Sequence, residues 1–441
     1  MPGTSRADAG ARRRGLRTLL ETLALLAIAA AVAVVWWRFI GVPVRALSMD
    51  LYPTWIAGRL WLAGHPEAIY HPKIGLFGLD AHPEWLRALE AAGQINTGTS
   101  FVYPLPYLWL TTPLSRAVSL DAFAALFLCL NALSALVLGA ESMRLAGYRG
   151  FGLRLLGGVL VAASFPALYG MGLGQNALPA AALLLLAFRL LRFPGRAPLA
   201  AGVALLLLAT AFKFWCVLAI PLLLLLRQPR AFAAAALAWA AVFLVAPRVL
   251  APGLSKSYAA VVARLSEVSL VTYNNVSLRS LLHRLWWDGW GDAVDHWPLL
   301  EPPASVRVLE TALLAAAGAV FCALVLWRKP PRHRVLAAGL GLMLLPLGVC
   351  WTHYFVFAIP VALVVALDRE LPVACRALGF ALLGLLLVPW HPLVYRTPVS
   401  PADVAVAPGW YLVWLALPIL LTQAAVFSAL VPRTARAPGP S

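Results

Sequence analysis

Long apolar stretches separated by short polar and basic segments dominate the pattern of the chain. A helix that crosses a bilayer needs about 20 consecutive apolar residues, so these stretches predict roughly 10 to 12 spans. The stretches are 18–41, 121–146, 155–191, 199–226, 231–250, 307–327, 335–367, 373–390 and 409–431. Backbone groups inside a bilayer must hydrogen-bond within the chain, so the pattern predicts an all-α fold, a polytopic transmembrane helical bundle.

The first apolar stretch superficially resembles a signal peptide, because it follows the basic segment "RADAGARRRGLR". It is too long for a signal peptide, and "VVWWRFIG" stands where a polar cleavage region should be. We therefore predict an uncleaved span at 18–41 with a cytoplasmic N-terminus. The ends, 1–15 and 433–441, have the polar composition of disordered segments, and residues 1–441 are predicted to form a single integral-membrane domain.

Basic clusters between the apolar stretches mark cytoplasmic connections, because such connections carry an excess of Lys and Arg. These clusters lie at 12–17, 189–196, 227–230, 328–334, 368–376 and 432–436, which also places the C-terminus in the cytoplasm. The long remaining segments 42–103, 251–306 and 391–408 then face outward. They are rich in Trp, Tyr, Pro and His, as segments at a membrane interface tend to be.

Two regions leave the topology open. If 103–120 spans inward, Arg144, Arg149 and Arg154 fall outside; if it is re-entrant, they fall inside, as the positive-inside rule requires. The stretch 199–226 is either one long span or two short helices that meet at Lys213. Broken helices at membrane depth are tolerated where they line a cavity.

Composition excludes an ordinary soluble domain: of the 441 residues 62% are hydrophobic and 12% charged, with a mean hydropathy of +0.82. The net charge of +17 is dispersed between apolar spans. Membrane topology explains this charge better than nucleic-acid binding does, so membrane lipids are a predicted partner and nucleic acid is not. The five cysteines show no metal-binding spacing, and the acidic segment that holds Asp288, Asp292, Asp295 and His296 fits no known calcium loop. We predict no metal and no other cofactor.

Asp50 lies just beyond the predicted outer end of the first span, in a loop with few other acidic residues. It is either a solvated or helix-capping residue or a general base whose pKa is raised by partial desolvation. Apolar residues at three- and four-residue spacing, among them Tyr52 and Trp55, predict an interfacial helix over 52–63 that ends at Gly64. A second interfacial helix is predicted over 84–93.

Six segments resemble successive landmarks of glycosyltransferase family 87. They are D-x-x-x-x-W-x-A-G-x-x-x-x-x-G-H-P-x-x-x-Y in the first outer loop, "FVYPLPYLWLTTPLS" (101–115), "GMGLGQNALPAAALLLLAF" (170–188), "AFKFWCVLAIPLLLLLRQPRAF" (211–232), "YNNVSLRSLLHRL" (273–285) and "WTHYFVFAIPVALVV" (351–365). The resemblance covers roughly three quarters of the chain, each landmark being weak alone. It implies the C-type fold and a polyprenyl-phosphate-sugar-dependent, mannosyltransferase-like enzyme.

The resemblance also implies roles for single residues. Asp50 matches the catalytic base. The residues that match donor-phosphate-binding positions are Lys213, Arg279, Arg284 and His353, although the proline that normally follows the family's lysine closely is missing here. Weaker candidates for substrate binding are Tyr52, Trp55, Tyr103, Gln175, Asn176 and Asn275.

The chemistry requires the same residue types, because an anionic phosphate leaving group needs cationic donors. Each residue also has a structural interpretation. Arg284 beside two tryptophans fits an interface anchor, His353 a hydrogen-bonded interface histidine, and Gln175 and Asn176 helix packing. An intramembrane lysine such as Lys213 is costly and favours a functional role.

These observations predict transfer of a hexose, expected to be mannose, from a polyprenyl-phosphate donor to a lipid-linked or cell-surface glycan. The site would lie on the outer side of a bacterial inner (plasma) membrane, and the reaction would be an inverting displacement. The main alternative is a transporter or flippase of lipid-linked saccharides, supported by Lys213 and the broken helices. A noncatalytic membrane scaffold is a third interpretation.

Overall fold

The structure is a computed structural model that describes residues 50–70, 82–93, 101–271, 275–286, 299–387 and 408–432. The predicted first span, the cytoplasmic N-terminus, the two predicted disordered ends and the acidic segment around Asp292 lie outside these residues. Side chains of 408–415 are likewise not described.

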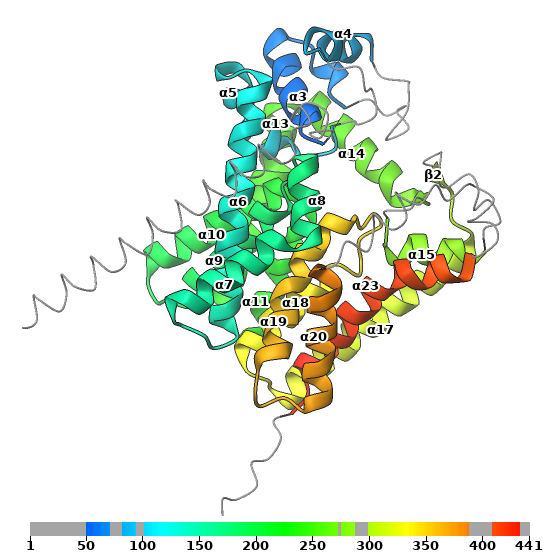
Figure 1. Ribbon diagram of the computed structural model, residues 1–441. Coiled ribbons are helices and arrows are strands. Elements are labelled where there is room, and N and C mark those ends of the chain that lie inside the picture. Colours follow the sequence, from blue (N-terminus) through cyan, green and yellow to red (C-terminus); the bar gives the residue numbers. More distant parts are fainter. Residues whose placement is uncertain are drawn as a thin grey trace, which may run out of the picture.

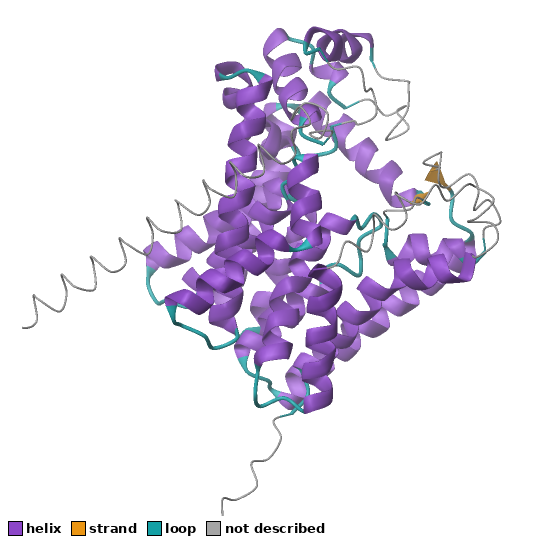
Figure 2. Cartoon of the chain, viewed as in Figure 1, coloured by secondary structure: helices purple, strands orange, loops and turns teal. Residues whose placement is uncertain are grey.

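The described chain is almost entirely helical (Figure 2). Its elements are α3 (Tyr52–Ala63), η1 (Pro66–Ala68), α4 (Pro83–Ala91), α5 (Leu105–Ala117), α6 (Leu120–Leu145), α7 (Phe151–Ala163), α8 (Phe165–Leu173), α9 (Ala177–Leu190), α10 (Arg196–Phe212), η2 (Phe214–Leu218), α11 (Ala219–Leu225), α12 (Pro229–Trp239), η3 (Ala240–Val245), α13 (Ala246–Leu250), α14 (Pro252–Glu267), β1 (Ser269–Leu270), α15 (Leu278–Arg284), β2 (Leu299–Leu300), α17 (Ala304–Arg328), α18 (Arg332–Leu342), η4 (Thr352–Ala358), α19 (Ile359–Leu367), α20 (Val373–Leu387) and α23 (Pro408–Ala429). The two strands pair antiparallel, with Ser269 opposite Leu300. The predicted all-α class is confirmed.

Three helical segments within the described residues are long and apolar enough to cross a membrane: Leu120–Leu145, Pro229–Leu250 and Ala304–Arg328. The pair α7 and α8, bent by 59°, makes a fourth if it is counted as one span. Six more apolar helices are shorter, at 10–17 residues. The described helices therefore give fewer full-length spans than the sequence predicts, because several apolar stretches break into short helices.

One of these breaks lies at Lys213. Helix α10 ends at Phe212, Lys213 adopts an extended conformation with φ −140° and ψ 103°, and the chain continues as the short 3-10 helix η2. The alternative of two short helices meeting at Lys213 is thus confirmed. The lysine sits where the backbone departs from regular helix, a location that suits a polar site at membrane depth.

Helices α3, α4 and α5 lie together at one end of the molecule, above the main bundle (Figure 1). The predicted helices of the first outer loop are present, and α3 ends at Gly64 as expected. Helix α3 packs against α5, and a Cβ on Gly58 would meet Ser115 Oγ at 2.5 Å. Tyr52, Ile56 and Leu60 are buried in this contact, so they face protein.

The length of helix α5 helps to distinguish a spanning from a re-entrant segment at 103–120. It has 13 residues, which is shorter than the about 20 needed to cross a bilayer. At the far end of α6, Glu141 pairs with both Arg144 (2.6 Å) and Arg189 (2.7 Å). Since Arg189 belongs to a predicted cytoplasmic cluster, this shared ion pair favours the re-entrant interpretation with Arg144 inside.

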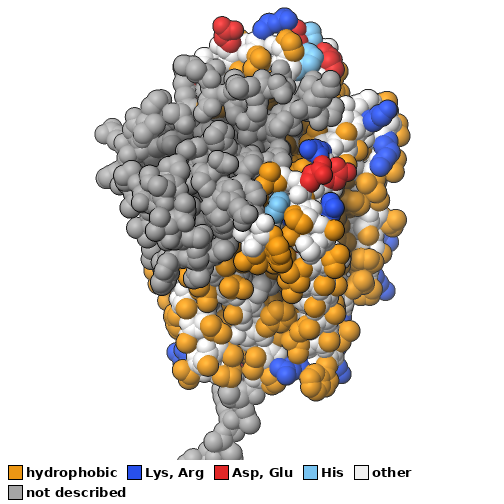
Figure 3. Space-filling view, turned by 90° about the vertical axis from the view of Figure 1, so that its right-hand side faces the viewer, with side chains coloured by type: hydrophobic (Ala, Val, Ile, Leu, Met, Phe, Trp, Pro, Cys, Tyr) orange, Lys and Arg blue, Asp and Glu red, His pale blue; other side chains and the backbone are white. Residues whose placement is uncertain are grey.

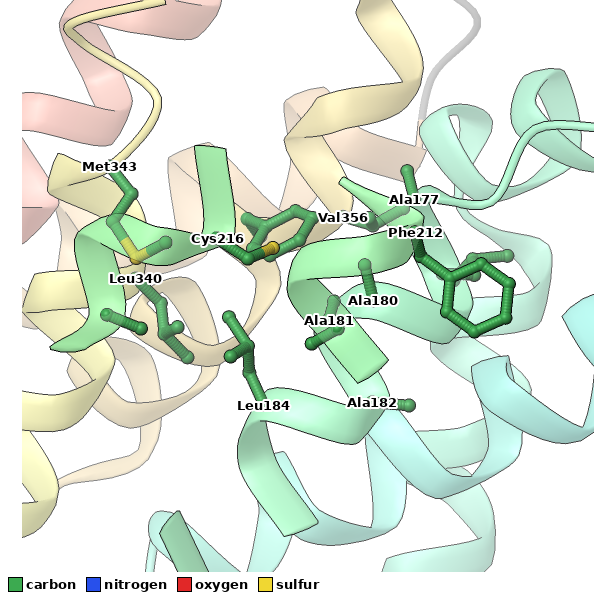
Figure 4. Close-up of a cluster of buried hydrophobic side chains, with 14 of the residues drawn as sticks. Ala177, Ala180, Ala181, Ala182, Leu184, Phe212, Cys216, Leu340, Met343 and Val356 are labelled. Atoms are coloured by element: carbon green, nitrogen blue, oxygen red, sulfur yellow. The ribbon is translucent and has the colours of Figure 1, made fainter. Parts of the chain in front are cut away.

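The core below the α3–α5 end is built around α9. Figure 4 shows its alanines beside Phe212, Cys216 and Val356, which come from three other elements. Small side chains on α9 let neighbouring helices approach closely, as is common in membrane bundles. The helix α9 also packs against η4.

The outer surface of the bundle is apolar. In Figure 3 hydrophobic side chains cover much of the visible described body, with Lys and Arg at its lower rim. Large exposed apolar side chains include Leu237, Val249 and Leu250 on α12 and α13, and Val308 and Leu326 on α17. Such a surface is suited to contact with lipid tails.

Candidate active site

Asp50 is held at the end of α8, far from it in sequence. Its backbone N–H donates to the carbonyl of Leu173 at 3.2 Å. Next to Leu173, Gly174 caps α8 in the left-handed conformation with φ 70°, and a Cβ there would meet Leu51 Cβ at 2.8 Å. Both the positive φ and this close approach require glycine, so the turn fixes the position of Asp50.

Gln175 joins Asp50 to Lys213. Its side-chain nitrogen donates to Asp50 Oδ2 at 2.5 Å, and its side-chain oxygen accepts from Lys213 Nζ at 2.6 Å. Because one amide can donate at one end and accept at the other, a carboxylate and an ammonium are connected in a defined order. The sequence made Gln175 one of the weaker candidates for substrate binding, and the structure engages both ends of its amide within the protein.

Lys213 is buried, and aromatic rings complete its surroundings. Its Nζ lies 3.4 Å from the Tyr354 hydroxyl, 4.7 Å from the centroid of that ring and 5.3 Å from the centroid of the Tyr103 ring. Ring faces attract cations, and more strongly where water is excluded. These ring faces would attract the charged form of Lys213, which burial disfavours.

His353 lies beside this group. Its ring centroid is 4.6 Å from that of Tyr354 and 6.2 Å from that of Tyr169, and the side chain is buried. Neither ring nitrogen has a hydrogen-bond partner in the protein. Buried imidazoles are normally hydrogen-bonded, so this arrangement leaves both nitrogens available to a ligand.

The Asp50 residue is half-buried. Burial raises the pKa of Asp50, while the hydrogen bond from Gln175 and the charge of Lys213 lower it without cancelling the effect of burial. A carboxylate with a raised pKa is a stronger base than an exposed one. The group is therefore suited to accept a proton from a substrate hydroxyl.

Other predicted phosphate-binding residues occupy a second region, around α15. Arg279 pairs with Glu310 at 2.8 Å and donates to the carbonyl of Ser266 at 2.6 Å, so it ties α15 to α14 and α17. Arg284 ends α15 and its side chain is buried, which does not fit a snorkelling interface anchor.

Asn275 has a structural role. Its side-chain nitrogen donates to the carbonyl of Leu270 at 2.7 Å, and its side-chain oxygen accepts from the backbone N–H groups of Ser277 (3.1 Å) and Cys350 (2.8 Å). These bonds hold the segment before α15 against the segment that leads to His353. Asn275 thus supports the site indirectly, and its binding of a substrate stays a prediction.

The aromatic candidates Tyr52, Trp55 and Tyr103 lie in different surroundings. Tyr103 faces Lys213, as described, but Trp55 donates its indole N–H to the carbonyl of Val118 at 3.2 Å. Tyr52 is buried between α3 and its neighbours. Tyr103 thus contributes directly to the surroundings of Lys213.

Three tyrosines of the site were not singled out from the sequence: Tyr354, Tyr169 and Tyr107. Tyr354 stands next to His353 in "WTHYFVFA", and Tyr107 belongs to "FVYPLPYLWL". Adjacency to His353 was a usable signal for Tyr354. The chain contains many aromatic residues, however, and only the packing of α5, α8 and η4 around Lys213 and His353 distinguishes these three.

Among the described residues, no three His, Cys, Asp or Glu side chains lie close enough together to hold a metal ion. Asp288, Asp292, Asp295 and His296 lie outside those residues. The polar groups gathered around Asp50 are one carboxylate, one ammonium, an amide and an imidazole, a set suited to proton transfer and anion binding.

Residues 101–349 match the model of a protein family described as glycosyltransferase family 87. The matched segment is more than half of the chain and includes Tyr103, Gln175, Asn176, Lys213 and α15. His353 lies just beyond it and Asp50 well before it, so the family match covers neither residue. No match was found among curated proteins or solved structures.

Proposed function

Because this chain belongs to glycosyltransferase family 87, we propose that it transfers a hexose from a polyprenyl-phosphate-linked donor to a lipid-linked or cell-surface glycan. Mannose is the hexose we propose. The protein would have the C-type fold and act at the outer face of a bacterial inner membrane. There, a donor held by lipid and an acceptor that reaches the surface from water can meet at Asp50.

The proposed reaction is a single displacement with inversion. Asp50 accepts the proton of an acceptor hydroxyl while that oxygen attacks the anomeric carbon from the face opposite the phosphate. The bond between the anomeric carbon and the phosphate oxygen breaks, and its electron pair leaves with the polyprenyl phosphate. Lys213 and His353, with Arg284, would stabilise the negative charge on the departing phosphate.

One observation carries this proposal: a carboxylate and a buried ammonium are connected through a single amide, Gln175. A displacement needs a base near the attacking oxygen and a cation near the leaving group, held a fixed distance apart. Arg279 would contribute through the position of α15, because its guanidinium is engaged with Glu310 and a backbone carbonyl.

Sugar transfer by Asp50→Asn tests the proposal. Membranes that contain the wild type should incorporate label from radiolabelled polyprenyl-phosphate mannose into a lipid-linked glycan extract. Asp50→Asn keeps the size of the side chain but cannot accept the proton, so kcat should fall by roughly 100- to 10,000-fold.

Glu67→Gln is the matched control, because it neutralises an exposed carboxylate in the same outer segment and should retain activity. Equal activity of wild type and Asp50→Asn at equal expression would remove Asp50 from the mechanism. No transfer by the wild type from any prenyl-linked sugar would contradict the proposed function and favour the transporter alternative.

A further inference from the structure

Asn176 begins α9 but does not cap it. Asparagine is among the residues preferred at this position because its side-chain oxygen usually accepts a backbone N–H of the first helical turn. Here the Asn176 side chain makes no such bond. Its amide is therefore directed to something other than the helix that it begins.

The same amide is buried and has no hydrogen-bond partner within the protein. Asn176 is 1% exposed, and neither its side-chain nitrogen nor its oxygen forms a hydrogen bond of good geometry. A buried amide without partners costs free energy in the unliganded protein. An unpartnered buried polar group in a native structure calls for an explanation. A ligand that binds to the group is one such explanation.

Two hydroxyl groups lie beside this amide. The Tyr107 hydroxyl lies within hydrogen-bonding reach of both Asn176 and Thr54, but neither contact has the geometry of a formed hydrogen bond. Thr54 is 1% exposed and its hydroxyl likewise has no hydrogen-bond partner. The three residues come from α3, α5 and the start of α9, so the fold brings them together from distant parts of the chain.

Asn176, Thr54 and Tyr107 lie next to the charged pair of Asp50 and Lys213. Asn176 follows Gln175, which binds Asp50 and Lys213, and Thr54 is one helical turn beyond Asp50. The ring of Tyr107 lies 4.7 Å from that of Tyr103, the ring that faces Lys213. The unpartnered polar groups thus stand next to the atoms that would perform the transfer.

We infer that Asn176, with Thr54 and Tyr107, forms the subsite that binds hydroxyl groups of the transferred sugar. This inference rests on the proposed function and deepens it, because it names the residues that select the sugar. An amide donates and accepts at once, and each hydroxyl can do either, which matches the paired donor and acceptor character of neighbouring hydroxyls on a hexose. A site of this kind discriminates strongly against a sugar that lacks the bound hydroxyl.

Deoxy donors test the assignment. The wild type and Asn176→Ala are compared on polyprenyl-phosphate mannose and on its 2-, 3-, 4- and 6-deoxy forms. In the wild type, removal of the hydroxyl that Asn176 binds should lower kcat/KM by roughly 10- to 100-fold. On the parent donor, kcat/KM of Asn176→Ala should be lower than that of the wild type by a similar factor. On that one deoxy donor, kcat/KM of Asn176→Ala should fall almost no further, because the interaction between Asn176 and the hydroxyl is already absent.

Asn131→Ala is the matched control, since Asn131 is an equally buried asparagine whose amide bonds within its own helix to the carbonyl of Phe127. It should discriminate among the deoxy donors as the wild type does. If Asn176→Ala keeps the wild-type ratio for every deoxy donor, the sugar subsite is elsewhere and the inference is overturned.

A binding measurement separates this inference from the proposed function. Detergent-solubilised protein is heated with polyprenyl phosphate or with polyprenyl-phosphate mannose, and the shift in Tm is recorded. The sugar should add to the wild-type shift, and Asn176→Ala should lose that addition while keeping the shift with polyprenyl phosphate. No shift of the wild type with either lipid would contradict the proposed function, whereas an undiminished sugar-dependent shift in Asn176→Ala would overturn only the subsite.

Discussion

Gln175 and Lys213 partly offset the effect of burial on the pKa of Asp50. Burial raises the pKa of Asp50, and Gln175 and Lys213 lower it, with burial the larger influence. A general base must be deprotonated, so activity should fall as the pH falls through this raised pKa. Gln175 therefore controls where on the pH scale the enzyme loses activity.

We predict that Gln175→Leu moves the acidic limb of the pH profile of kcat/KM to higher pH. The leucine cannot donate to Asp50 Oδ2, so the protonated carboxyl is favoured and the pKa of Asp50 rises further. It also releases Lys213, so kcat/KM near neutral pH should fall by roughly tenfold or more. The measurement is the complete pH profile of sugar transfer.

A control for this change is Gln228→Leu, which removes an amide from the predicted cytoplasmic connection at 227–230. It should leave the profile in place. If the acidic limb of Gln175→Leu lies at the same pH as that of the wild type, whatever the maximal rate of the variant, the Gln175 amide does not affect the pKa of Asp50.

At the scale of elements, helices α6 and α7 approach closely at two glycines. A Cβ on Gly139 would meet the carbonyl oxygen of Gly157 at 2.1 Å, and one on Gly157 would meet Met143 Cγ at 2.3 Å. Small residues at such crossings let helix backbones pack directly against each other in membranes. We predict that Gly139→Ala forces the helices apart and destabilises the protein by about 1–3 kcal/mol.

Gly152→Ala in α7 provides the comparison, because a Cβ there would meet nothing within 4 Å. Alanine favours helix over glycine by up to about 1 kcal/mol, so this variant should be as stable as the wild type or more stable. Thermal unfolding of both variants in the same detergent measures the difference. Equal unfolding temperatures would mean that the α6–α7 crossing adapts to an added methyl group.

For the whole molecule, the distribution of charge predicts its orientation. Ion pairs lie at helix ends that the sequence assigns to the cytoplasm: Glu141 with Arg189, and Arg334 with Asp368 at 2.7 Å. The α3–α5 end lies away from α18 and α20 (Figure 1) and is the predicted outer end.

We therefore predict opposite labelling of two exposed positions, Glu67 and Arg196. In a background without the five native cysteines, Glu67→Cys should react with a membrane-impermeant maleimide on intact spheroplasts. Arg196→Cys should react only after the membrane is permeabilised. Labelling of Arg196→Cys on intact cells would reverse the orientation and place Asp50 on the cytoplasmic side.

The sequence by itself determined the all-α class of the protein and the end of α3. Apolar stretches required helices, because backbone groups in a bilayer must pair internally. Glycine 64 ended α3, and an intramembrane lysine, Lys213, marked the break in its stretch. The landmarks led to the family, because they are local in sequence and keep their order.

The tertiary structure alone decided which polar residues meet. Asp50, Gln175, Lys213 and Tyr354 are separated by many residues, and no periodicity reports distances between such segments. Within the described residues, fewer full-length spans are found than the apolar stretches predict, since hydropathy records how apolar a stretch is and not where packing bends it. Gln175 and Asn176 are adjacent amides with the same side-chain chemistry. Only the fold engages one with Asp50 and Lys213 and leaves the other buried without a partner.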